Sequence, residues 1–301
     1  MILVTGGAGF IGSHTVAALE AQGARVRVLD DLSTGRRENL DVTHAELQVG
    51  SITDADAVAV AMRGVTHVVH LAARISVPES CADPVGYHAV NGGGFVTVAQ
   101  AARTAGVERL VFATSCAVYG SLPGLPKREG DPVAPESPYA SSKLANEAFA
   151  SSFTALGLGC VGLRYFNVFG PRQDPGGPYG AVIPRFVERA LRGESLTIFG
   201  DGEQGRDFVS VKDVARANVA GLRGKPGVYN IGTGRMLTVN ALAARVRAIV
   251  GDVPVTHLGE REGDVRLSCA DVDAARVGLG WSASEVFEDA LDETIRWFRK
   301  G

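Results

Sequence analysis

The chain opens with a short apolar run that leads directly into a glycine-rich loop. Residues 1–5 have the pattern of a buried strand, and Gly6, Gly9 and Gly12 follow at intervals of three, ahead of an apolar helical pattern. Glycines at this spacing allow a tight turn and let the helix pack closely against the strand. A strand that passes through such a turn into a helix predicts a βαβ unit, and hence a parallel sheet.

The first two thirds of the chain repeat this alternation. Short apolar runs predict strands at 1–5, 25–30, 46–50, 67–71, 109–114 and 160–165. Amphipathic patterns between them predict helices at 11–22, 54–62, 84–105 and 138–156. Strands that alternate with helices in this way predict a Rossmann-type, doubly wound parallel sheet with helices on both faces.

The pattern changes after about residue 166, where a Gly/Pro-rich loop spans residues 170–177. The remainder predicts helices at 181–192, 212–222, 239–250 and 284–299, and short strands at 196–199, 206–209 and 227–231. Ser282 and Glu285 have the spacing of a capping box ahead of the last helix. We therefore expect an α/β fold in which 1–166 form the Rossmann domain, with some later segments returning to it. Residues 167–301 would mainly form a smaller, mixed α/β C-terminal lobe.

Composition excludes several classes of protein. A chain of 301 residues with a net charge of −3 offers no basic face for nucleic acid. Its four cysteines are scattered without zinc-ligand spacing, so we expect no metal site and reduced thiols. Neither a signal peptide nor a long apolar stretch is apparent, which predicts a cytoplasmic protein without membrane contact.

Asp30 indicates which ligand the glycine loop binds. It closes the second expected strand, 18 residues after Gly12, where a carboxylate can accept hydrogen bonds from both ribose hydroxyls of an adenosine. The helix N-terminus after the loop suits a pyrophosphate. Because a carboxylate repels a 2′-phosphate, the pattern predicts NAD as the cofactor and not NADP. We interpret the nearby Arg36 and Arg37 as a solvated surface pair.

Tyr139 and Lys143 are the candidate catalytic pair. Pro138 can open a helix, and residues four apart lie on one helix face, about 6 Å along the axis. A lysine ammonium, aided by an oxidised nicotinamide, favours the phenolate form of the tyrosine and predicts a proton-transferring base. Ser115 follows the strand expected at 109–114, where its hydroxyl can orient a substrate oxygen toward Tyr139.

These residues together resemble a known family. The glycine loop, Asp30, the runs at 70–73 and 115–120, and Tyr139-x-x-x-Lys143 resemble the extended short-chain dehydrogenase/reductases. The runs Arg164-Tyr-Phe-Asn-Val-Phe-Gly-Pro-Arg-Gln-Asp174 and Phe199-Gly-Asp-Gly-Glu-Gln-Gly-Arg-Asp-Phe208 are similar to those of the NAD-dependent UDP-hexose 4-epimerases. The similarity covers nearly the whole chain.

The resemblance implies roles for two sets of residues. The cofactor set comprises Gly6, Gly9, Phe10, Ile11, Gly12, Asp30, Asp31, Ser33, Thr34, Gly35, Ser51, Ile52, Leu71, Ala72, Ala73, Asn91, Tyr139, Lys143 and Tyr165. The UDP-sugar set comprises Ser115, Asn167, Ala181, Val182, Ile183, Thr197, Ile198, Phe199, Arg206, Arg261, Asp264 and Ser268. Two arginines in the second set suit a diphosphate, because a guanidinium is permanently charged and forked.

The implied reaction interconverts UDP-galactose and UDP-glucose through a transient 4-keto sugar, with NAD recycled. Two departures from the family pattern refine it. Asn91-Gly-Gly-Gly-Phe95 replaces a more regular sequence and predicts a looser helix. Ser268 stands where relatives restricted to glucose and galactose tend to carry a bulky tyrosine, so UDP-GlcNAc and UDP-GalNAc are also expected to fit. The family further implies a homodimer formed through helices near 84–105 and 138–156.

Other functions remain open at this point. A UDP-glucuronate 4-epimerase needs no additional catalytic group. A sugar-nucleotide dehydratase or decarboxylase needs a further acid or base beside Ser115, where this chain has Cys116 and Ala117. A one-way reductase would consume external NAD(P)H. A non-catalytic NAD sensor would not need the Tyr139–Lys143 pair.

Overall fold

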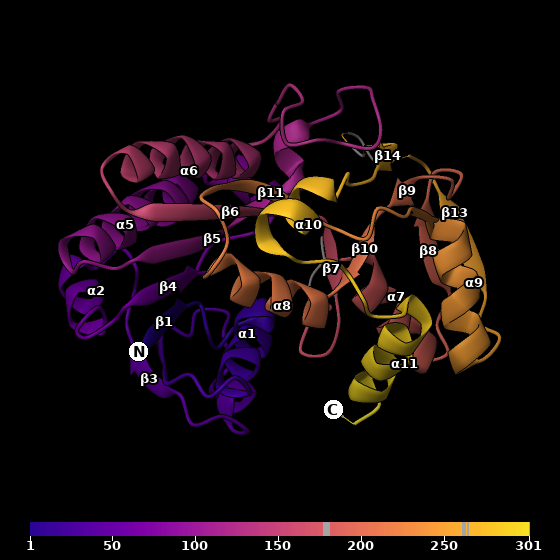
Figure 1. Cartoon of the computed structure of the whole chain (residues 1–301). Helices are drawn as coiled ribbons and strands as arrows, with labels where there is room; N and C mark the ends of the chain where they lie inside the picture. Colours follow the sequence, from indigo (N-terminus) through magenta and orange to yellow (C-terminus); the bar gives the residue numbers. More distant parts are fainter. Residues whose placement is uncertain (177–180, 261–262, 264, 301) are drawn as a thin grey trace.

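The computed structural model describes residues 1–176, 181–260, 263 and 265–300. Its centre is a seven-stranded sheet in the order β11-β6-β5-β4-β1-β2-β3, with every neighbouring pair parallel (Figure 1). This confirms the Rossmann-type α/β fold. The strands are β1 (Ile2–Thr5), β2 (Val26–Asp30), β3 (Glu46–Val49), β4 (His67–His70), β5 (Arg109–Ser115), β6 (Gly159–Tyr165) and β11 (Gly227–Ile231).

Helices cover both faces of this sheet (Figure 1). On one face α2, α5 and α6 enclose a core that includes Leu3, Val68 and Phe112. On the other face α1, α8 and α10 enclose a core that includes Val4 and Val69. Adjacent residues of one strand are thus buried on opposite faces, which explains the uninterrupted apolar runs in the sequence. The helices are α1 (Phe10–Glu20), α2 (Ala55–Ala61), α5 (Gly94–Thr104), α6 (Pro138–Ala155), α8 (Val211–Gly221) and α10 (Asp273–Leu279).

The segment between β4 and β5 is more divided than the sequence predicts. In place of one helix over 84–105, α4 (Pro84–Tyr87) continues through a π-helical turn (His88–Gly93) into α5. The π-helical turn contains Asn91 and the first two of the three glycines, where a looser helix was expected. An unexpected helix, α3 (Val77–Ala82), precedes α4, and two 3₁₀ turns lie elsewhere, η1 (Arg37–Leu40) and η3 (Cys116–Tyr119).

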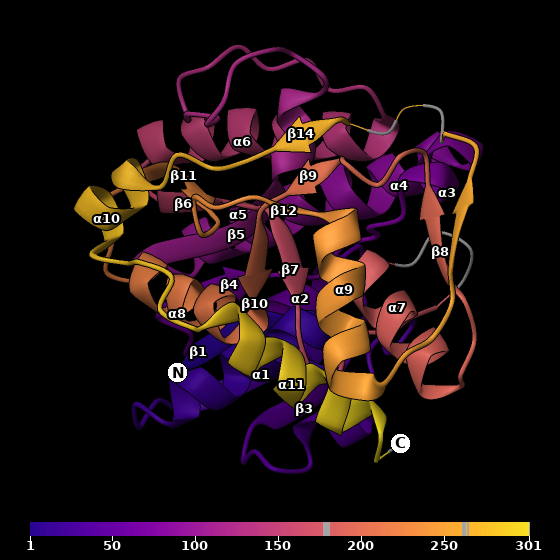
Figure 2. The same cartoon turned by 90° about the vertical axis from the view of Figure 1, so that its right-hand side faces the viewer.

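The remaining elements form a lobe beside the sheet with its own core (Figure 2). Phe186, Leu196, Leu242 and Ile295 are buried there. The strands of this lobe pair as β7 (Asn167–Phe169) with β10 (Phe208–Ser210), β8 (Leu196–Phe199) with β13 (Val255–Leu258), and β9 (Gly205–Arg206) with both β12 (Leu237–Thr238) and β14 (Leu267–Ser268). Its helices are α7 (Val182–Leu191), α9 (Val239–Val250) and α11 (Phe287–Phe298).

Two expectations for this lobe are wrong. The strand expected at 206–209 is split at Asp207 into β9 and β10, because the two parts pair with different strands. The capping box of Ser282 and Glu285 does not form. Helix α11 begins later, and the N-cap position is held by Val286, which has no side-chain acceptor. The carboxylate of Asp213 instead accepts hydrogen bonds from the backbone N–H groups of Ser284 and Glu285.

Later parts of the chain also return to the first sheet. Strand β11 pairs with β6, and α8 packs against α1, so the sheet is completed by residues beyond 166. Over the described ranges, no helix has both the length and the apolar composition that a bilayer crossing requires.

Candidate active site

The strand order of the sheet reverses between β1 and β4, and we call the carboxyl edge of the sheet at this reversal the crevice. The backbone N–H of Leu71 donates to the carbonyl of Thr5 at 3.0 Å, which joins the ends of the two strands. A Cβ on Gly6 would lie 2.6 Å from the backbone nitrogen of Ala72, and the φ of Gly6 is +70°. Only glycine permits so close an approach of the two loops. In open α/β sheets, ligands bind at this kind of reversal.

The first turn of α1 forms the floor of the crevice. Gly9 is the N-cap residue, and among the described residues no side chain caps this helix end. The N–H groups of the first turn therefore point at a position that suits a pyrophosphate. A Cβ on Gly12 would lie 2.0 Å from the carbonyl oxygen of Gly6, so the loop can fold only with glycine there. This cradle fits a dinucleotide such as NAD.

Asp30 ends β2 beside this loop. Its buried carboxylate accepts hydrogen bonds from the backbone N–H groups of Ala8 and Leu32, both at 2.9 Å. A carboxylate has about four acceptor positions, so two remain for ribose hydroxyls. Asp30 therefore fixes the glycine loop and can bind an adenosine ribose at the same time. Gly35 closes over the carboxylate, where a Cβ would lie 2.7 Å from Oδ1.

Other residues expected to bind the cofactor lie at or after the carboxyl ends of strands in the same sheet. Asp31 accepts hydrogen bonds from Ser33, and Thr34 is exposed beside them. Ser51 and Ile52 follow β3, with Ile52 buried against Gly94. Asn91 is buried and pairs with both backbone groups of Arg74, which holds the segment containing Ala72 and Ala73. The hydroxyl of Tyr165 points into the core and donates to Asn218.

The catalytic candidates come from β5 and α6. Ser137 caps α6 by accepting from the backbone N–H of Ala140 at 3.1 Å, and Pro138 occupies the first turn as expected. The Ser115 and Tyr139 side chains are hydrogen-bonded. The ammonium of Lys143 lies 5.8 Å from the centre of the Tyr139 ring and donates to the carbonyl of Ala113 at 3.2 Å. The structure thus brings together the three residues predicted to act on the substrate.

Burial dominates the electrostatics of this group in the chain without its cofactor. Burial raises the pKa of Tyr139 to about 12, and the hydrogen bond with Ser115 offsets this only partly. Burial also lowers the pKa of Lys143 to about 8. In the chain without its cofactor, desolvation opposes the charged forms of both Tyr139 and Lys143. Deprotonation of Tyr139 depends on a further positive charge, and an oxidised nicotinamide would supply one.

A buried ion pair fixes α6 against the sheet. Glu147, one turn beyond Lys143, accepts two hydrogen bonds from the guanidinium of Arg164 on β6, at 2.9 and 2.7 Å. The same carboxylate accepts a hydrogen bond from Thr114 at 2.7 Å, directly before Ser115. Both charged side chains are less than a tenth exposed. This pair therefore sets the position of the catalytic helix relative to Ser115.

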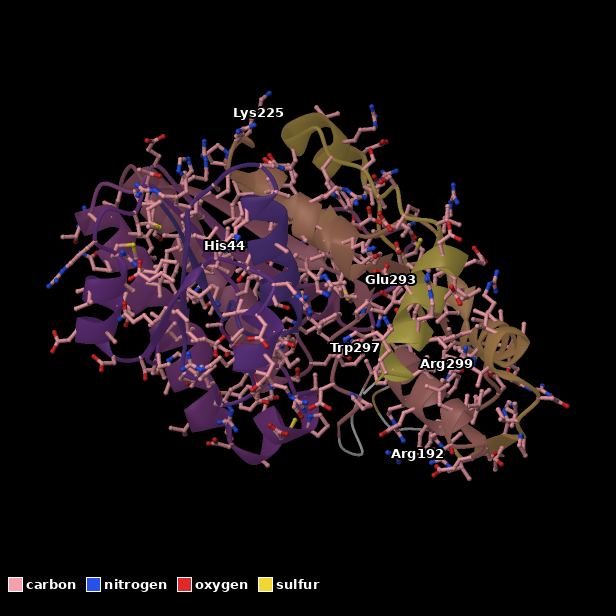
Figure 3. All side chains as sticks on the ribbon, turned by 90° about the horizontal axis from the view of Figure 1, so that it is seen from below. His44, Arg192, Lys225, Glu293, Trp297 and Arg299 are labelled. Carbon is pink, nitrogen blue, oxygen red and sulfur yellow. The ribbon has the colours of Figure 1, made fainter. Side chains whose placement is uncertain are left out.

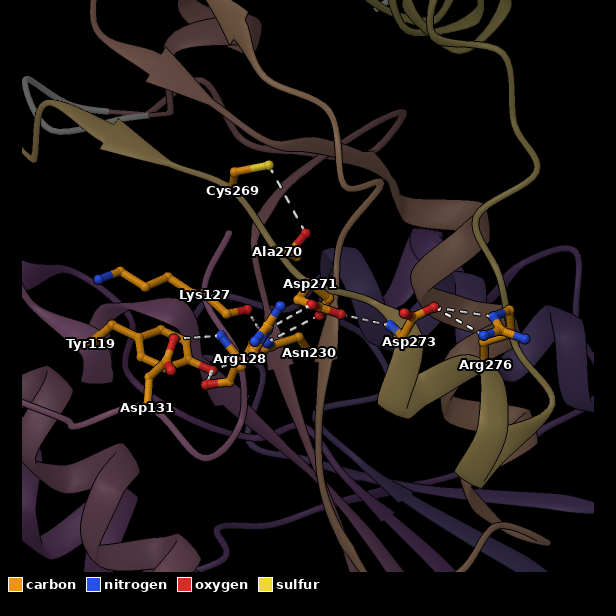
Figure 4. Close-up of polar contacts among 10 residues, drawn as sticks. All are labelled: Tyr119, Lys127, Arg128, Asp131, Asn230, Cys269, Ala270, Asp271, Asp273 and Arg276. Atoms are coloured by element: carbon orange, nitrogen blue, oxygen red, sulfur yellow. Dashed lines mark hydrogen bonds and ion pairs between the residues drawn. The ribbon is translucent and has the colours of Figure 1, made fainter. Parts of the chain in front are cut away.

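The Arg164 guanidinium extends this network toward the C-terminal lobe. It donates to the hydroxyl of Tyr119 at 2.9 Å, and that hydroxyl donates to Asn230 at 2.7 Å. Figure 4 shows Asn230 between the backbone of Lys127 and that of Asp271. The side-chain amide of Asn230 donates to the carbonyls of both residues, at 2.8 and 3.2 Å. The catalytic helix and the segment after β14 are thus joined through one chain of buried polar contacts.

A second hollow lies beside α7 and β8, and we call it the nucleotide pocket. It measures about 200 Å³. Its lining includes six of the twelve residues of the UDP-sugar set. The full lining is Asn167, Val182, Arg185, Phe186, Arg189, Thr197, Ile198, Phe199, Gln204, Arg206 and Val239. Ala181 caps the N-terminus of α7, and the side chain of Ile183 is buried in the core of the lobe.

Cys116 and Ser268 link the residue after Ser115 to the strand that bears Arg206. Their side chains are hydrogen-bonded, and Ser268 lies opposite Arg206 in the pairing of β14 with β9. Cys116 follows Ser115 directly, and burial raises the pKa of its thiol to about 11. It is therefore uncharged at neutral pH and a poor acid or base. Arg261 and Asp264, also expected at the substrate, lie outside the described residues.

Sequence reasoning missed several residues of the site. Arg185, Arg189 and Gln204 line the nucleotide pocket. The helical spacing of Val182, Arg185, Phe186 and Arg189 was the available signal, because residues three and four apart share a helix face. Asp207, which lies within the run 199–208, was also not predicted as a site residue. Its buried carboxylate accepts hydrogen bonds from the residues at 233, 234 and 270 and so anchors the strand next to Arg206.

Comparisons with known proteins agree with this geometry. The model of the NAD dependent epimerase/dehydratase family matches residues 2–232. A UDP-glucose 4-epimerase of Mycolicibacterium smegmatis is 41% identical over 308 residues, which cover 99% of this chain and 98% of that protein.

Solved structures are similar over the same extent. A UDP-N-acetylglucosamine 4-epimerase from Methanobrevibacter ruminantium, in complex with UDP-N-acetylmuramic acid, is 40% identical with a TM-score of 0.96, covering 99% of this chain and 98% of that one. A Thermus thermophilus UDP-glucose 4-epimerase in complex with NAD is also 40% identical, with a TM-score of 0.92 and the same coverage. The chain belongs to the NAD dependent epimerase/dehydratase family.

Proposed function

We propose that this protein is an NAD-dependent UDP-hexose 4-epimerase that interconverts UDP-galactose and UDP-glucose through a transient 4-keto sugar. One observation carries the proposal: the Ser115–Tyr139–Lys143 group adjoins, through Cys116 and Ser268, a pocket lined by arginines. A sugar linked to a diphosphate would reach from that pocket to Tyr139. Relatives named UDP-glucose 4-epimerase support the same assignment.

We propose different binding roles for the two parts of the chain. We propose residues 1–166, with the later segments β11 and α8, as the NAD domain, and the rest of 167–301 as the UDP-sugar lobe. The glycine loop and Asp30 would hold NAD, which would supply the acceptor and donor of the hydride at C4 of the sugar. Ser115 orients the 4-hydroxyl, Tyr139 takes its proton, and Lys143 favours the phenolate form.

The pocket around Ser268 favours a broad choice of sugar. Ser268 and Cys116 are small side chains in mutual contact, and they leave more space than a tyrosine at 268 would. We propose that UDP-GlcNAc and UDP-GalNAc are also substrates. The structural similarity to a UDP-N-acetylglucosamine 4-epimerase supports this. Cys116, uncharged beside Ser115, does not favour a dehydratase or decarboxylase.

The assembly and location are part of the same proposal. We propose a cytoplasmic homodimer that pairs through α5 and α6. Exposed apolar side chains on neighbouring helices support this proposal: Phe149 on α6 is 42% exposed, and Val85 in α4 is 79% exposed. Light scattering on the purified protein should give twice the chain mass of 31.4 kDa. A monomer at micromolar concentration would contradict it.

The decisive experiment is a substrate panel. Purified protein is incubated separately with UDP-galactose, UDP-GlcNAc and UDP-GlcA, without added reductant, and the C4 configuration is followed by NMR. We expect conversion of UDP-galactose to UDP-glucose, conversion of UDP-GlcNAc, and no conversion of UDP-GlcA. A protein inert toward all three would refute the function. Activity on UDP-GlcA alone would replace it with a uronate epimerase.

A further inference from the structure

The backbone of Tyr139 carries an N–H group that its own helix does not satisfy. Tyr139 lies in the first turn of α6, where backbone N–H groups have no carbonyl partner within the helix. The cap residue Ser137 accepts from the N–H of Ala140. The N–H of Tyr139 donates instead to the hydroxyl of Ser80 on α3, at 3.1 Å and 59 residues away along the chain. A second, distant segment therefore holds the start of the catalytic helix.

The hydroxyl of Ser80 makes two hydrogen bonds. Ser80 is completely buried, and its hydroxyl donates to the carbonyl of Val77 at 2.6 Å while it accepts from Tyr139. The bond to Val77 fixes the side-chain rotamer, so that the Ser80 oxygen is directed at the start of α6. Helix α3 is itself well defined, because Ser76 caps it and Pro78 lies in its first turn. The contact with Tyr139 is thus built on a fixed support.

The carbonyl of Tyr139 is held through a second hydroxyl. Ser142 donates to this carbonyl at 2.7 Å, and the side-chain amide of Asn91 in the π-helical turn donates to Ser142 at 3.1 Å. Asn91 also pairs with both backbone groups of Arg74, at 2.8 and 2.9 Å. Both polar backbone groups of Tyr139 are therefore joined to the segment between β4 and α5.

The position of this backbone decides where the phenolic oxygen of Tyr139 lies. The phenol is hydrogen-bonded to Ser115, and the titratable groups around it are Lys143 on the same helix, Cys116 after β5 and Tyr87 of α4. A tyrosine side chain has only two torsions, so a shift of its backbone also shifts the hydroxyl. A displacement of about 1 Å from the reacting atoms can lower a rate about 100-fold.

We propose that Ser80 is a positioning residue for the reaction, which fixes Tyr139 through the backbone N–H of that residue. The inference rests on the proposed epimerase function where it predicts an effect on kcat. It also predicts the environment of the Tyr139 hydroxyl, whichever sugar the protein acts on. It assigns a role to α3, a helix that neither the sequence pattern nor the family resemblance indicated.

The test compares three variants of the NAD-loaded protein. Ser80→Ala removes the acceptor of the Tyr139 N–H. Ser80→Thr keeps a hydroxyl, because a threonine in a helix can also bond a carbonyl three or four residues back, although its added methyl group enters a buried position and should lower the Tm. The control Ser76→Ala removes the cap of the same helix, where Ser76 accepts from Glu79, and leaves the contact with Tyr139 in place. Circular dichroism and the Tm establish that each variant is folded.

Steady-state kinetics with UDP-galactose give the first readout. We expect Ser80→Ala to lower kcat about 5- to 50-fold, while KM and the affinity for UDP stay within about twofold of the wild type. The reason is that the nucleotide pocket lies in the other lobe and is unchanged. Ser80→Thr and Ser76→Ala should keep kcat within about threefold, even where the Tm falls. A general weakening of α3 would not separate these variants.

The second readout does not depend on turnover. The protein is prepared with tyrosine carrying ¹³C at Cζ, which labels all six tyrosines, and the NMR resonance lost in Tyr139→Phe belongs to Tyr139. The Cζ shift reports the hydrogen bonding and ionisation of the hydroxyl. The Tyr139 resonance should therefore move in Ser80→Ala and keep its wild-type position in Ser76→Ala and Ser80→Thr.

Two results would overturn the inference. If Ser80→Ala keeps kcat within about twofold of the wild type, or leaves the Tyr139 resonance unchanged, the contact does not position Tyr139. If Ser76→Ala or Ser80→Thr loses as much kcat as Ser80→Ala, the effect arises from the packing of α3 and not from the hydroxyl. Both results leave the proposed function intact. A wild type inert toward every UDP-sugar would refute that function, and the Tyr139 resonance would then decide the role of Ser80.

Discussion

The catalytic crevice and the nucleotide pocket differ in how deeply their charged side chains are buried. In the crevice, Lys143, Glu147 and Arg164 are buried, and each is already held by protein partners. In the pocket, Arg185, Arg189 and Arg206 are only partly buried and share one sign of charge. The crevice holds its charged side chains in buried positions, whereas the pocket leaves its arginines partly exposed to a ligand. Substitutions in the crevice should therefore cause large losses of activity or stability, and those in the pocket should cause smaller changes in binding.

The largest effect is expected at the centre of the crevice. Tyr139→Phe keeps the ring but removes the hydroxyl bonded to Ser115, and kcat for UDP-galactose should fall about 100- to 10,000-fold. The affinity for UDP, measured by titration, should stay within twofold, because the nucleotide pocket is unchanged. A variant that keeps more than a tenth of the wild-type kcat would contradict the role of Tyr139.

The next largest effect is on stability. Glu147→Gln leaves Arg164 buried without a counter-charge, which should lower the free energy of unfolding by about 3–5 kcal/mol. The matched control is Glu188→Gln, which breaks the exposed pair with Arg192 and should cost less than about 1 kcal/mol. Urea denaturation measures both. Equal losses in the two variants would show that the buried pair does not fix the catalytic helix.

Lys143 gives a prediction with a defined pH dependence. Its pKa falls from 10.5 to about 8 in the folded state, so the unfolded chain binds the proton more tightly between these values. Stability of the wild type, relative to Lys143→Met, should therefore rise with pH from about 8 to about 10.5 and stay constant below 8. At pH 7, the NAD-free Lys143→Met variant should be more stable by about 1–3 kcal/mol.

Denaturation of the NAD-free protein at several pH values tests this. The comparison with Lys225→Met provides the control, since Lys225 is exposed on the surface of the molecule (Figure 3). A stability difference between wild type and Lys143→Met that does not change from pH 7 to pH 10 would mean that the ammonium is not buried.

The smallest effect concerns the choice of sugar. Ser268→Tyr fills the space beside Cys116 and should lower kcat/KM for UDP-GlcNAc, relative to UDP-galactose, about 10- to 100-fold. The affinity for UDP should not change. Steady-state kinetics with both sugars measure the ratio, and Ser268→Ala serves as the control of similar size. A wild type active on UDP-galactose but inert on UDP-GlcNAc would contradict the expected space at this position.

The crevice was more predictable from sequence than the pocket, because its features are local. Gly6, Gly12 and Asp30 act through the backbone turn in which they lie, and Tyr139 and Lys143 share one helix. The parallel pairing of the strands followed from their alternation with helices. These relations depend on spacing along the chain, which a sequence shows directly.

The features that were missed depend on contacts between distant segments. Asp213 replaces the expected capping box only because α8 lies next to the start of α11. Asn230 joins Lys127 to Asp271 across more than a hundred residues. The raised pKa of Tyr139 results from burial, and burial is a property of the folded chain. Arg185 could have been found by its helical spacing, but nothing in the sequence shows which hollow α7 faces.

One measurement tests the central claim most directly. UDP-galactose that carries deuterium at C4 is incubated with the purified protein without added reductant, and the UDP-glucose formed is analysed by NMR and mass spectrometry. The account predicts that the product retains deuterium at C4, because the hydride leaves and returns within one site. Deuterium lost from the product, or turnover that requires stoichiometric NADH, would contradict it.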